Sequence, residues 1–322
     1  MNKLLRFLRF CLYSLLVIVA LGAVLFGYFV YTPAPDMPRL SGTLARGAID
    51  VGGLKRTYVT YVPKGLAKGA PLVVVMHGSG ESSAQIRIET GYGFERLADE
   101  HGFAVVYPNA ANAGDWNACS VVGKVDSDDV GFLTRLVDKL GTDIGIDPAR
   151  VFATGSSRGG SMAIRLALEA PSRFRAVAAV SASVPTPDNF HCKPTGPGAS
   201  VMIINGTEDP LVPFDGGEVS LLGLAYRNGK VLSSHESGQY FANLDHITGM
   251  PATNETRIAD GVRVEHVLWR NDSKVEVELV AIHGGGHGMP QPYRRHPRLL
   301  GPSPVQPNGP EMIWAFFERQ RQ

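Results

Sequence analysis

Gly155, Ser157 and Gly159 form a Gly-x-Ser-x-Gly pattern, which places a serine on a sharp turn between a strand and a helix. Residues 151–154 favour a strand before the turn, and the largely apolar residues 161–170 favour a helix after it. The two glycines are needed because neighbouring backbone comes too close for a Cβ atom. A hydroxyl exposed on such a turn is suited to nucleophilic attack, so we predict that Ser157 is a nucleophile.

A carboxylate follows a later apolar run. Residues 201–205 read as a buried strand, and Asp209 comes shortly after their end. Because ligands in open α/β sheets bind beyond the carboxyl ends of the strands, we favour Asp209 as a catalytic acid. Glu208 is its nearest competitor, and a turn carboxylate before proline is the structural alternative.

A histidine stands in a glycine-rich stretch near another strand end. Residues 275–282 read as a strand, His283 lies at its end, and His287 follows three glycines. We favour His287 as a base, because it lies past the strand and because its glycine neighbours suit a mobile, exposed position. The same glycines disfavour a helix, so a His-x-x-x-His metal site is not expected.

The order serine, aspartate, histidine along the chain is that of the α/β-hydrolases. In such a site His287 takes the proton of Ser157 during attack, and Asp209 fixes the tautomer of the imidazole. The oxyanion needs two backbone N–H donors. We predict Arg158, the residue after the nucleophile, and Ser79, in the glycine-rich loop after an early strand. This chemistry requires no cofactor.

The elements that must position these residues follow from apolar runs that alternate with amphipathic segments. They predict an α/β fold with a mainly parallel sheet, helices on both faces, an edge hairpin at Gly52-Gly53, and one domain over residues 40–322. The predicted strands are 48–51, 56–62, 71–76, 103–107, 151–154, 176–184, 201–205, 262–269 and 275–282. The predicted helices are 94–101, 130–140, 161–170, 234–247, with Ser234 as N-cap, and 310–317.

The amino terminus is first basic and then apolar. Lys3, Arg6 and Arg9 precede the uncharged run 10–31, which as a helix would span about 33 Å against a hydrocarbon core of about 30 Å. We therefore favour an uncleaved membrane anchor, with the rest of the chain outside the cytoplasm on the periplasmic side; a cleaved signal and secretion are the alternative. The Pro-rich residues 32–39 predict a short stiff spacer that leads away from the membrane.

Composition and charge narrow the function further. The 322 residues carry a net charge of +1 and no long basic run, so nucleic acid is not expected as a partner. The three cysteines show neither a C-x-x-C pair nor zinc-ligand spacing. On an oxidising exported side Cys119 and Cys192 could pair, or they could remain two buried thiols. No oligomeric state is indicated.

Several stretches together resemble the polyhydroxybutyrate depolymerase-like esterases, a group that includes feruloyl and acetylxylan esterases of the carbohydrate esterase type. The resemblance runs from about residue 54 to residue 317. It implies an α/β-hydrolase fold and a secreted serine esterase without cofactor, in which Ser157 is the nucleophile, Asp209 the acid and His287 the base. The stretches that carry it are His77–Gly80, Asp115–Asn117, Asp128–Phe132, Gly155–Gly160, Asn205–Pro213 with Gly216-Gly217, Gly284–His287 and Ile313–Phe317.

The resemblance also bears on the surroundings of the site. The family often has cysteine where Ser79 stands, and an aromatic pair where Gly288-Met289 stands, so the wall of the acyl pocket differs in this chain. Cys119 and Cys192 fall near positions where family members carry cysteines, which implies a disulfide. We expect Trp116 either to line the acyl pocket or to pack a loop.

Two charged clusters lie outside the predicted site. The acidic one consists of Asp126, Asp128 and Asp129, and we interpret it as capping the following helix rather than as a metal or substrate site. The basic one consists of Arg294, Arg295, His296 and Arg298. We interpret it as a solvated face, or alternatively as a site for an anionic substrate or a lipid headgroup.

Taken together, these observations predict a membrane-anchored, extracytoplasmic serine ester hydrolase. Its expected substrates are aryl or carbohydrate esters, such as feruloyl and acetyl esters, or hydroxyalkanoate oligomers. A serine peptidase of the prolyl-oligopeptidase kind shares the order of the triad, but the chain leaves no room for the propeller domain of such enzymes. An inactive hydrolase-fold binding protein is the alternative from another class.

Overall fold

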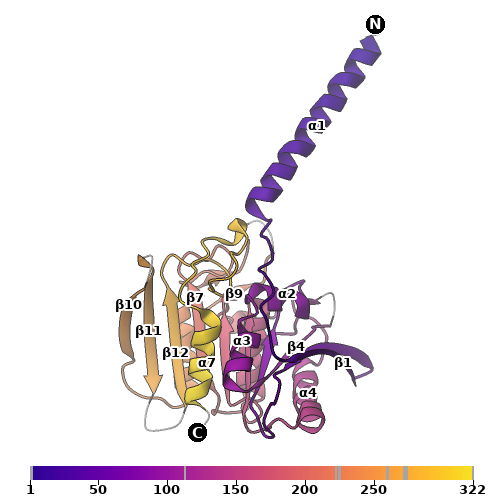
Figure 1. Cartoon of the computed structure of the whole chain (residues 1–322). Coiled ribbons are helices and arrows are strands. Elements are labelled where there is room, and N and C mark those ends of the chain that lie inside the picture. Colours follow the sequence, from indigo (N-terminus) through magenta and orange to yellow (C-terminus); the bar gives the residue numbers. More distant parts are fainter. Residues whose placement is uncertain are drawn as a thin grey trace.

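The computed structural model describes residues 3–111, 114–221, 223, 226–258, 261–270 and 275–320. A ten-stranded sheet lies at the centre of the globular part, and the long helix α1 (Lys3–Phe29) extends away from it (Figure 1). The strands are β1 (Thr43–Val51), β2 (Leu54–Val62), β3 (Leu72–Met76), β4 (Ala104–Pro108), β5 (Val151–Ser156), β6 (Ala176–Val180), β7 (Ser200–Gly206), β10 (Ala252–Arg257), β11 (Arg263–Arg270) and β12 (Glu276–Ile282). Strands β8 (Gly217–Glu218) and β9 (Lys230–Val231) form a separate small sheet.

The sheet is parallel in its middle and antiparallel at both edges. Its order is β1-β2-β4-β3-β5-β6-β7-β12-β11-β10, and the neighbours from β4 to β12 are paired in parallel. Strands β1 and β2 extend one edge as an antiparallel hairpin, and β11 and β10 extend the other. The parallel strands therefore all end on the same side, which is where the predicted catalytic residues follow them.

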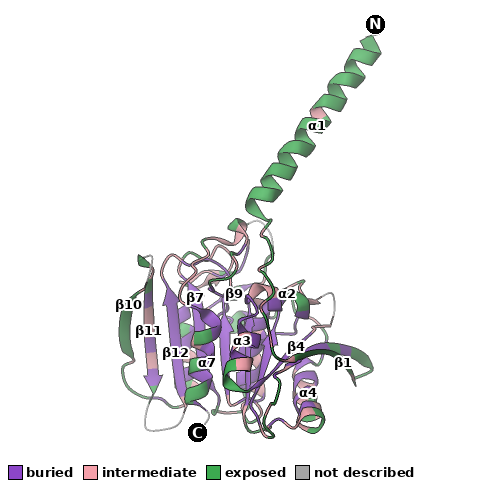
Figure 2. Ribbon diagram, viewed as in Figure 1, coloured by how far each residue is buried: buried purple, intermediate pink, exposed green. Residues whose placement is uncertain are grey.

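Alternate side chains of the central strands point to opposite faces of the sheet and belong to two separate cores. In β3, Leu72 and Val74 belong to one core, and Val73 and Val75 belong to the other. This is why the strand reads as a continuous apolar run, since both of its faces are covered. The first core packs under helices α4 (Asp129–Ile144), α5 (Arg158–Glu169) and α6 (Ser234–Leu244). The second packs under α2 (Ser83–Glu89), α3 (Gly93–His101) and α7 (Gly309–Arg319), and the buried strands between the layers are purple in Figure 2.

The predicted mainly parallel sheet with helices on both faces is confirmed, but several local predictions are corrected. Strand β6 ends at Val180 rather than at Val184. The cap of α6 is Ser233 rather than Ser234, because Ser233 forms a reciprocal capping box with Glu236. Helix α2 and strand β10 were not predicted. Every residue of β10 is exposed, so its sequence carries no alternation of apolar and polar residues.

The amino-terminal part consists of a long apolar helix and the spacer that follows it. Among the residues that the structure describes, α1 is the one helix long and apolar enough to cross a membrane, and it packs against no core (Figure 2). Residues 32–39 run from the end of α1 along the surface of the domain (Figure 1). Leu40 packs on the second core, and the backbone N–H and hydroxyl of Ser41 both donate to Asp99, at 2.7 and 2.8 Å.

The acidic cluster before α4 divides into two roles. Asp128 is the N-cap, as predicted, and its carboxylate accepts from the N–H of Gly131 at 2.8 Å. Asp129 instead points inwards and is fully buried, with Arg56 of β2 at 2.6 Å. The Asp129 carboxylate also accepts from the N–H of Asn117 at 2.7 Å and from the hydroxyl of Ser127 at 2.9 Å. The buried pair therefore joins the edge hairpin to α4.

We expect Asp129→Ala to lower the free energy of unfolding by about 3–5 kcal/mol, because the charge of Arg56 would remain buried without a partner. Asp143→Ala is the control, since it removes the partner of Lys139 in an exposed pair and should shift stability far less. Denaturant unfolding of both variants measures the difference. Equal losses would contradict the role that we give to the buried pair.

Candidate active site

Ser157 lies on a strained turn between β5 and α5. Its φ is +56° and its ψ is −119°, a conformation that costs about 1–3 kcal/mol outside glycine, and its N–H donates to Val180 O at 2.8 Å. A Cβ on Gly155 would lie 2.5 Å from the carbonyl carbon of Gly159, and one on Gly159 would lie 2.3 Å from Met76 O. The glycines of the pattern are therefore required by close backbone contact, as the sequence predicts.

The structure brings Asp209 and His287 together at two different strand ends. Asp209 Oδ2 lies 2.8 Å from His287 Nδ1, and both side chains are nearly inaccessible. Asp209 Oδ1 accepts from the N–H groups of Leu211 and Val212, each at 2.8 Å, which fixes the carboxylate. Because a carboxylate accepts, Nδ1 must carry the proton and Nε2 is left as the basic nitrogen.

His283 and Glu208, the sequence alternatives to His287 and Asp209, do not take part in this contact. His283 lies beside Arg263, at 3.1 Å, and Glu265, at 3.4 Å, both of which belong to the neighbouring strand β11. Glu208 contributes its backbone N–H to Gly285 O at 2.8 Å. The structure therefore favours Asp209 and His287 over their sequence neighbours.

The glycines around His287 serve close packing, which corrects the expectation of a mobile, exposed histidine. His287 is 5% exposed, and its N–H donates to Leu300 O at 2.7 Å. A Cβ on Gly286 would lie 2.4 Å from the same carbonyl oxygen. A Cβ on Gly288 would lie 2.8 Å from the ring of His296, so this glycine leaves room for that ring to line the cavity. Burial lowers the pKa of His296, which donates from Nε2 to Met289 O.

The loop after β3 supplies the candidate oxyanion donors. Gly78 N–H donates to Glu81 Oε2 at 2.8 Å and Gly80 N–H to Gly114 O at 3.1 Å, which favours the N–H of Ser79 as the donor to substrate. The hydroxyl of Ser79 donates to Asp115. Arg158 is the first residue of α5, so its N–H has no acceptor within the helix. Both residues therefore present backbone donors beside Ser157.

Trp116 packs beneath the oxyanion loop, which is the second of the two roles expected for it. Its side chain is fully buried, and Nε1 donates to His77 O at 2.9 Å. The ring of His77 donates from Nδ1 to Gly78 O at 2.7 Å and accepts at Nε2 from the N–H of Ala110 at 3.0 Å. Burial lowers the pKa of His77, in keeping with a neutral ring that supports the loop. Trp116 therefore has no free surface with which to contact substrate.

The side chain of Arg158 has a structural role that the sequence does not reveal. It is buried, with Nε donating to Trp116 O at 2.8 Å and Nη2 to Gly123 O at 2.7 Å. Nη1 donates to Asn228 Oδ1 at 3.1 Å. One side chain thus ties two loops to the first turn of α5, beside the nucleophile.

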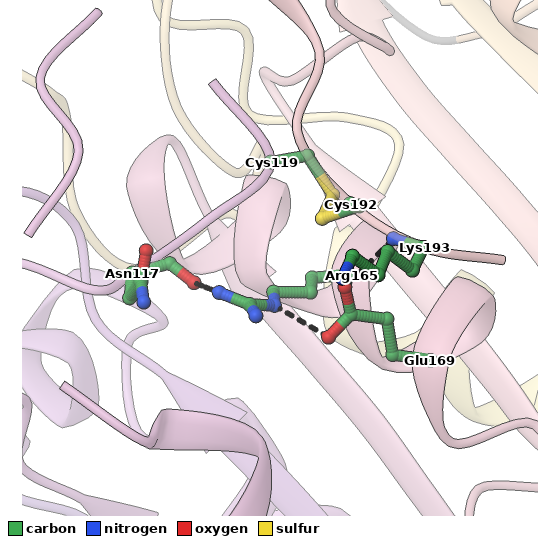
Figure 3. The surroundings of a disulfide bond; sticks show 6 residues. All are labelled: Asn117, Cys119, Arg165, Glu169, Cys192 and Lys193. Atoms are coloured by element: carbon green, nitrogen blue, oxygen red, sulfur yellow. Dashed lines mark hydrogen bonds and ion pairs between the residues drawn. A yellow bond between two sulfur atoms is a disulfide. The ribbon is translucent and has the colours of Figure 1, made fainter. Parts of the chain in front are cut away.

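A buried disulfide lies close to the same region. Cys119 and Cys192 are bonded, as the family resemblance implied (Figure 3). Arg165 of α5 lies beside the bond and donates to Asn117 O at 2.6 Å and to Glu169 at 2.9 Å. The disulfide and the apolar helix α1 together suggest export, since disulfides persist in oxidising compartments.

Ser157 and His287 line one cavity of about 270 Å³. Its apolar wall comes from Leu211, Leu221 and Leu300, and its polar wall includes two residues that sequence reasoning missed. These are Glu81 and Glu89, which lie on and just before α2, a helix that the sequence did not predict. Glu81 lies before the helix and Glu89 at its last residue, so no sequence pattern joins the two.

The Glu81 carboxylate acts on the titration of Glu89 by its charge and by a hydrogen bond. Burial, and then the charge and hydrogen bond of Glu81, raise the pKa of Glu89 well above its usual 4.5, and Arg294 offsets part of this effect. Glu81 is also the acceptor for the N–H of Gly78. Protonation of Glu89 is therefore linked through Glu81 to the loop after β3.

The parallel sheet and the serine on its sharp turn define an α/β-hydrolase, and comparison with solved structures agrees. Acetyl xylan esterase from Aspergillus awamori has the same fold, with a TM-score of 0.56 and 18% identity over 77% of this chain and 94% of that chain. The family model described as Esterase PHB depolymerase matches residues 56–194. The putative esterase NocK of Nocardia uniformis subsp. tsuyamanensis is 32% identical over 289 residues, 84% of this chain and 81% of NocK. The chain therefore belongs to the PHB depolymerase esterase family and is a carboxylic ester hydrolase.

Other members show the range of named activities. Feruloyl esterase C of Emericella nidulans is 31% identical over 182 residues, 54% of this chain and 62% of that protein. Poly(3-hydroxyalkanoate) depolymerase C of Paucimonas lemoignei is 26% identical over 257 residues, 71% of this chain and 58% of that protein. The family includes relatives named as feruloyl esterases and a relative named as a poly(3-hydroxyalkanoate) depolymerase.

We expect Asp209→Asn to lower kcat/KM about 10²- to 10⁴-fold, because the amide cannot stabilise the imidazolium that forms on His287. Glu208→Gln is the matched control and should have little effect. Steady-state hydrolysis of a p-nitrophenyl ester measures both variants. A larger loss from Glu208→Gln would reassign the acid.

We expect Glu89→Gln to flatten the dependence of stability on pH. The raised pKa means that the folded protein keeps a proton that the unfolded chain releases near pH 4.5. The stabilisation by Glu89 is complete below pH 4.5. It is lost as the pH rises through the pKa that Glu89 has in the folded protein. The loss of unfolding free energy between about pH 5 and pH 8 should therefore be smaller in Glu89→Gln than in the wild type. Exposed Glu100 supplies the control, Glu100→Gln, which should keep the wild-type slope.

Proposed function

We propose that this protein is an exported serine ester hydrolase that works through an acyl-enzyme on Ser157. Residues 40–322 form its catalytic domain, and residues 1–31 anchor it on the periplasmic side of the membrane. Its substrates are aryl or carbohydrate esters, such as feruloyl and acetyl esters, or hydroxyalkanoate oligomers. The named activities of the relatives and the family membership support this range of substrates.

The contact between Asp209 Oδ2 and His287 Nδ1, at 2.8 Å and out of contact with solvent, is the observation that carries the proposal. It leaves the Nε2 atom of His287 basic, and both His287 and Ser157 line the same cavity. A buried Asp–His pair beside a strained serine is expensive to maintain for packing alone. The arrangement is what an acyl-transfer site requires.

The reaction begins when Ser157 Oγ attacks the ester carbonyl and His287 Nε2 takes its proton. The N–H groups of Arg158 and Ser79 stabilise the oxyanion. His287 then gives the proton to the departing alcohol, and the acyl group stays on Ser157. Water, deprotonated by His287, attacks the acyl-enzyme and releases the acid. Asp209 stabilises the imidazolium in both halves of the cycle.

The walls of the cavity bear on the choice of substrate. Leu211, Leu221 and Leu300 offer an apolar surface for an aryl or alkyl group. Glu81 and Glu89 offer a hydrogen-bonding surface, and a pair of carboxyl groups disfavours an anionic ester. The cavity therefore fits neutral esters that combine an apolar part with hydroxyl groups.

We expect Ser157→Ala to abolish turnover of p-nitrophenyl butyrate, with a loss of about 10³-fold or more in kcat, and to abolish labelling by a fluorophosphonate. Ser172→Ala changes an exposed serine and is the control for both measurements. Retained hydrolysis with retained labelling would place the nucleophile elsewhere. Failure of the wild type to label would favour an inactive binding protein.

A further inference from the structure

The end of α1 is held against the domain by the basic cluster of the sequence. Arg298 Nη1 donates to Tyr28 O at 3.0 Å, and its guanidinium lies 4.4 Å from the centre of the Tyr28 ring. Arg294 Nη2 donates to the hydroxyl of Thr32 at 2.7 Å. Figure 1 shows α1 leaving the domain beside the loops that follow β12. Two contacts thus fix where the apolar helix meets the globular part.

The contact lies at the level of a membrane surface. α1 has 27 residues, about 40 Å of helix, which exceeds the hydrocarbon thickness of about 30 Å. Tyr28, Phe29 and Tyr31 are exposed at its carboxyl end, and tyrosine is typical of the boundary between membrane and water. Arg298, in contact with Tyr28, is therefore placed among lipid headgroups when α1 spans the bilayer.

The charge of this segment suits anionic headgroups. Residues 290–304 contain three arginines and no acidic residue. Arg295 and Arg298 are exposed, and Arg294 is half-buried beside Thr32. We call these three residues the arginine collar. Anionic lipids attract basic residues close to a membrane surface.

The collar belongs to the segment that holds the catalytic loop. Leu300 O accepts the N–H of His287 at 2.7 Å, and Pro302 O accepts that of Gly286 at 2.7 Å. The side chain of Leu300 lines the cavity that contains Ser157. The segment that carries the collar therefore also forms part of the cavity wall through Leu300. A membrane surface that touches the collar would lie next to the cavity.

The spacer cannot hold the site away from the membrane. Residues 32–39 run along the domain, and the next residues are fixed by contacts of Leu40 with the core and of Ser41 with Asp99. The domain is thus held at the helix end rather than at the end of a free tether.

We propose that the arginine collar rests on anionic lipid headgroups and holds the catalytic cavity at the membrane surface, so that the enzyme takes neutral esters dissolved in the bilayer. This rests on the proposed catalytic role of Ser157 and adds to it the source of the substrate. Short soluble esters reach the same cavity from water, but esters with long alkyl chains are presented to it by the membrane.

The first test measures position and is independent of activity. The full chain with Cys11→Ser and a bimane label on Arg295→Cys is reconstituted in vesicles of phosphatidylcholine and phosphatidylglycerol. Lipids with a spin label on the headgroup should quench this probe strongly. A label on Arg135→Cys, an exposed position on α4, which lies away from α1 in Figure 1, should be quenched little. Equal, weak quenching at both positions would overturn the proposal, whatever the esterase assays show.

The second test measures use of the membrane. The double variant Arg295→Glu/Arg298→Glu should lose roughly five- to tenfold more kcat/KM on p-nitrophenyl palmitate in the same vesicles than on p-nitrophenyl acetate in water. Arg135→Glu is the matched charge control and should leave both substrates unchanged. The milder pair Arg295→Gln/Arg298→Gln serves if the reversal harms folding.

Three results of the second test have distinct meanings. A selective loss on the palmitate ester that disappears in vesicles of phosphatidylcholine alone supports the proposal. An equal loss on both esters would overturn it, because the arginines would then act only on the catalytic loop. If Ser157→Ala kept its activity while the position test succeeded, the proposed catalytic role would fail and the membrane contact would stand.

Discussion

The close approach of α5 to the end of β3 is the contact on which the site depends. Gly159 has no room for a Cβ because Met76 O would lie 2.3 Å from it. This contact places the start of the helix beside the loop that begins after Met76. The proposed nucleophile and both proposed oxyanion donors are thereby brought within one small region, although Ser79 and Ser157 are far apart in sequence. Neighbouring parallel strands make this possible because their carboxyl ends lie side by side.

The second half of the site depends on a different backbone contact. The N–H of His287 is bound by Leu300 O, so the histidine is positioned by a loop that comes after it in the chain. That loop also carries Arg298, which contacts the end of α1. The position of His287 and the place where α1 meets the domain are consequently set by the same few residues.

Two buried charged groups near the site have hydrogen-bonding partners inside the protein. Arg158 and the Arg56–Asp129 pair are buried and hydrogen-bonded, and they support loops rather than reacting. Glu89 is different, because burial and Glu81 keep its pKa high. A carboxyl group with a raised pKa can act as both a donor and an acceptor when it is protonated, which supports the proposal of hydroxyl-bearing esters.

The sequence by itself determined the parallel sheet, the triad candidates and the apolar amino-terminal helix. These features leave local signals: continuous apolar runs for strands buried on both faces, and glycines at fixed spacing around Ser157, where backbone contact excludes a side chain. Only the tertiary structure decided that the glycines beside His287 serve close packing, that Glu81 and Glu89 share a cavity wall, and that Arg298 meets Tyr28, 270 residues away. Such pairings depend on how distant elements pack, and no local pattern of apolar and polar residues records them.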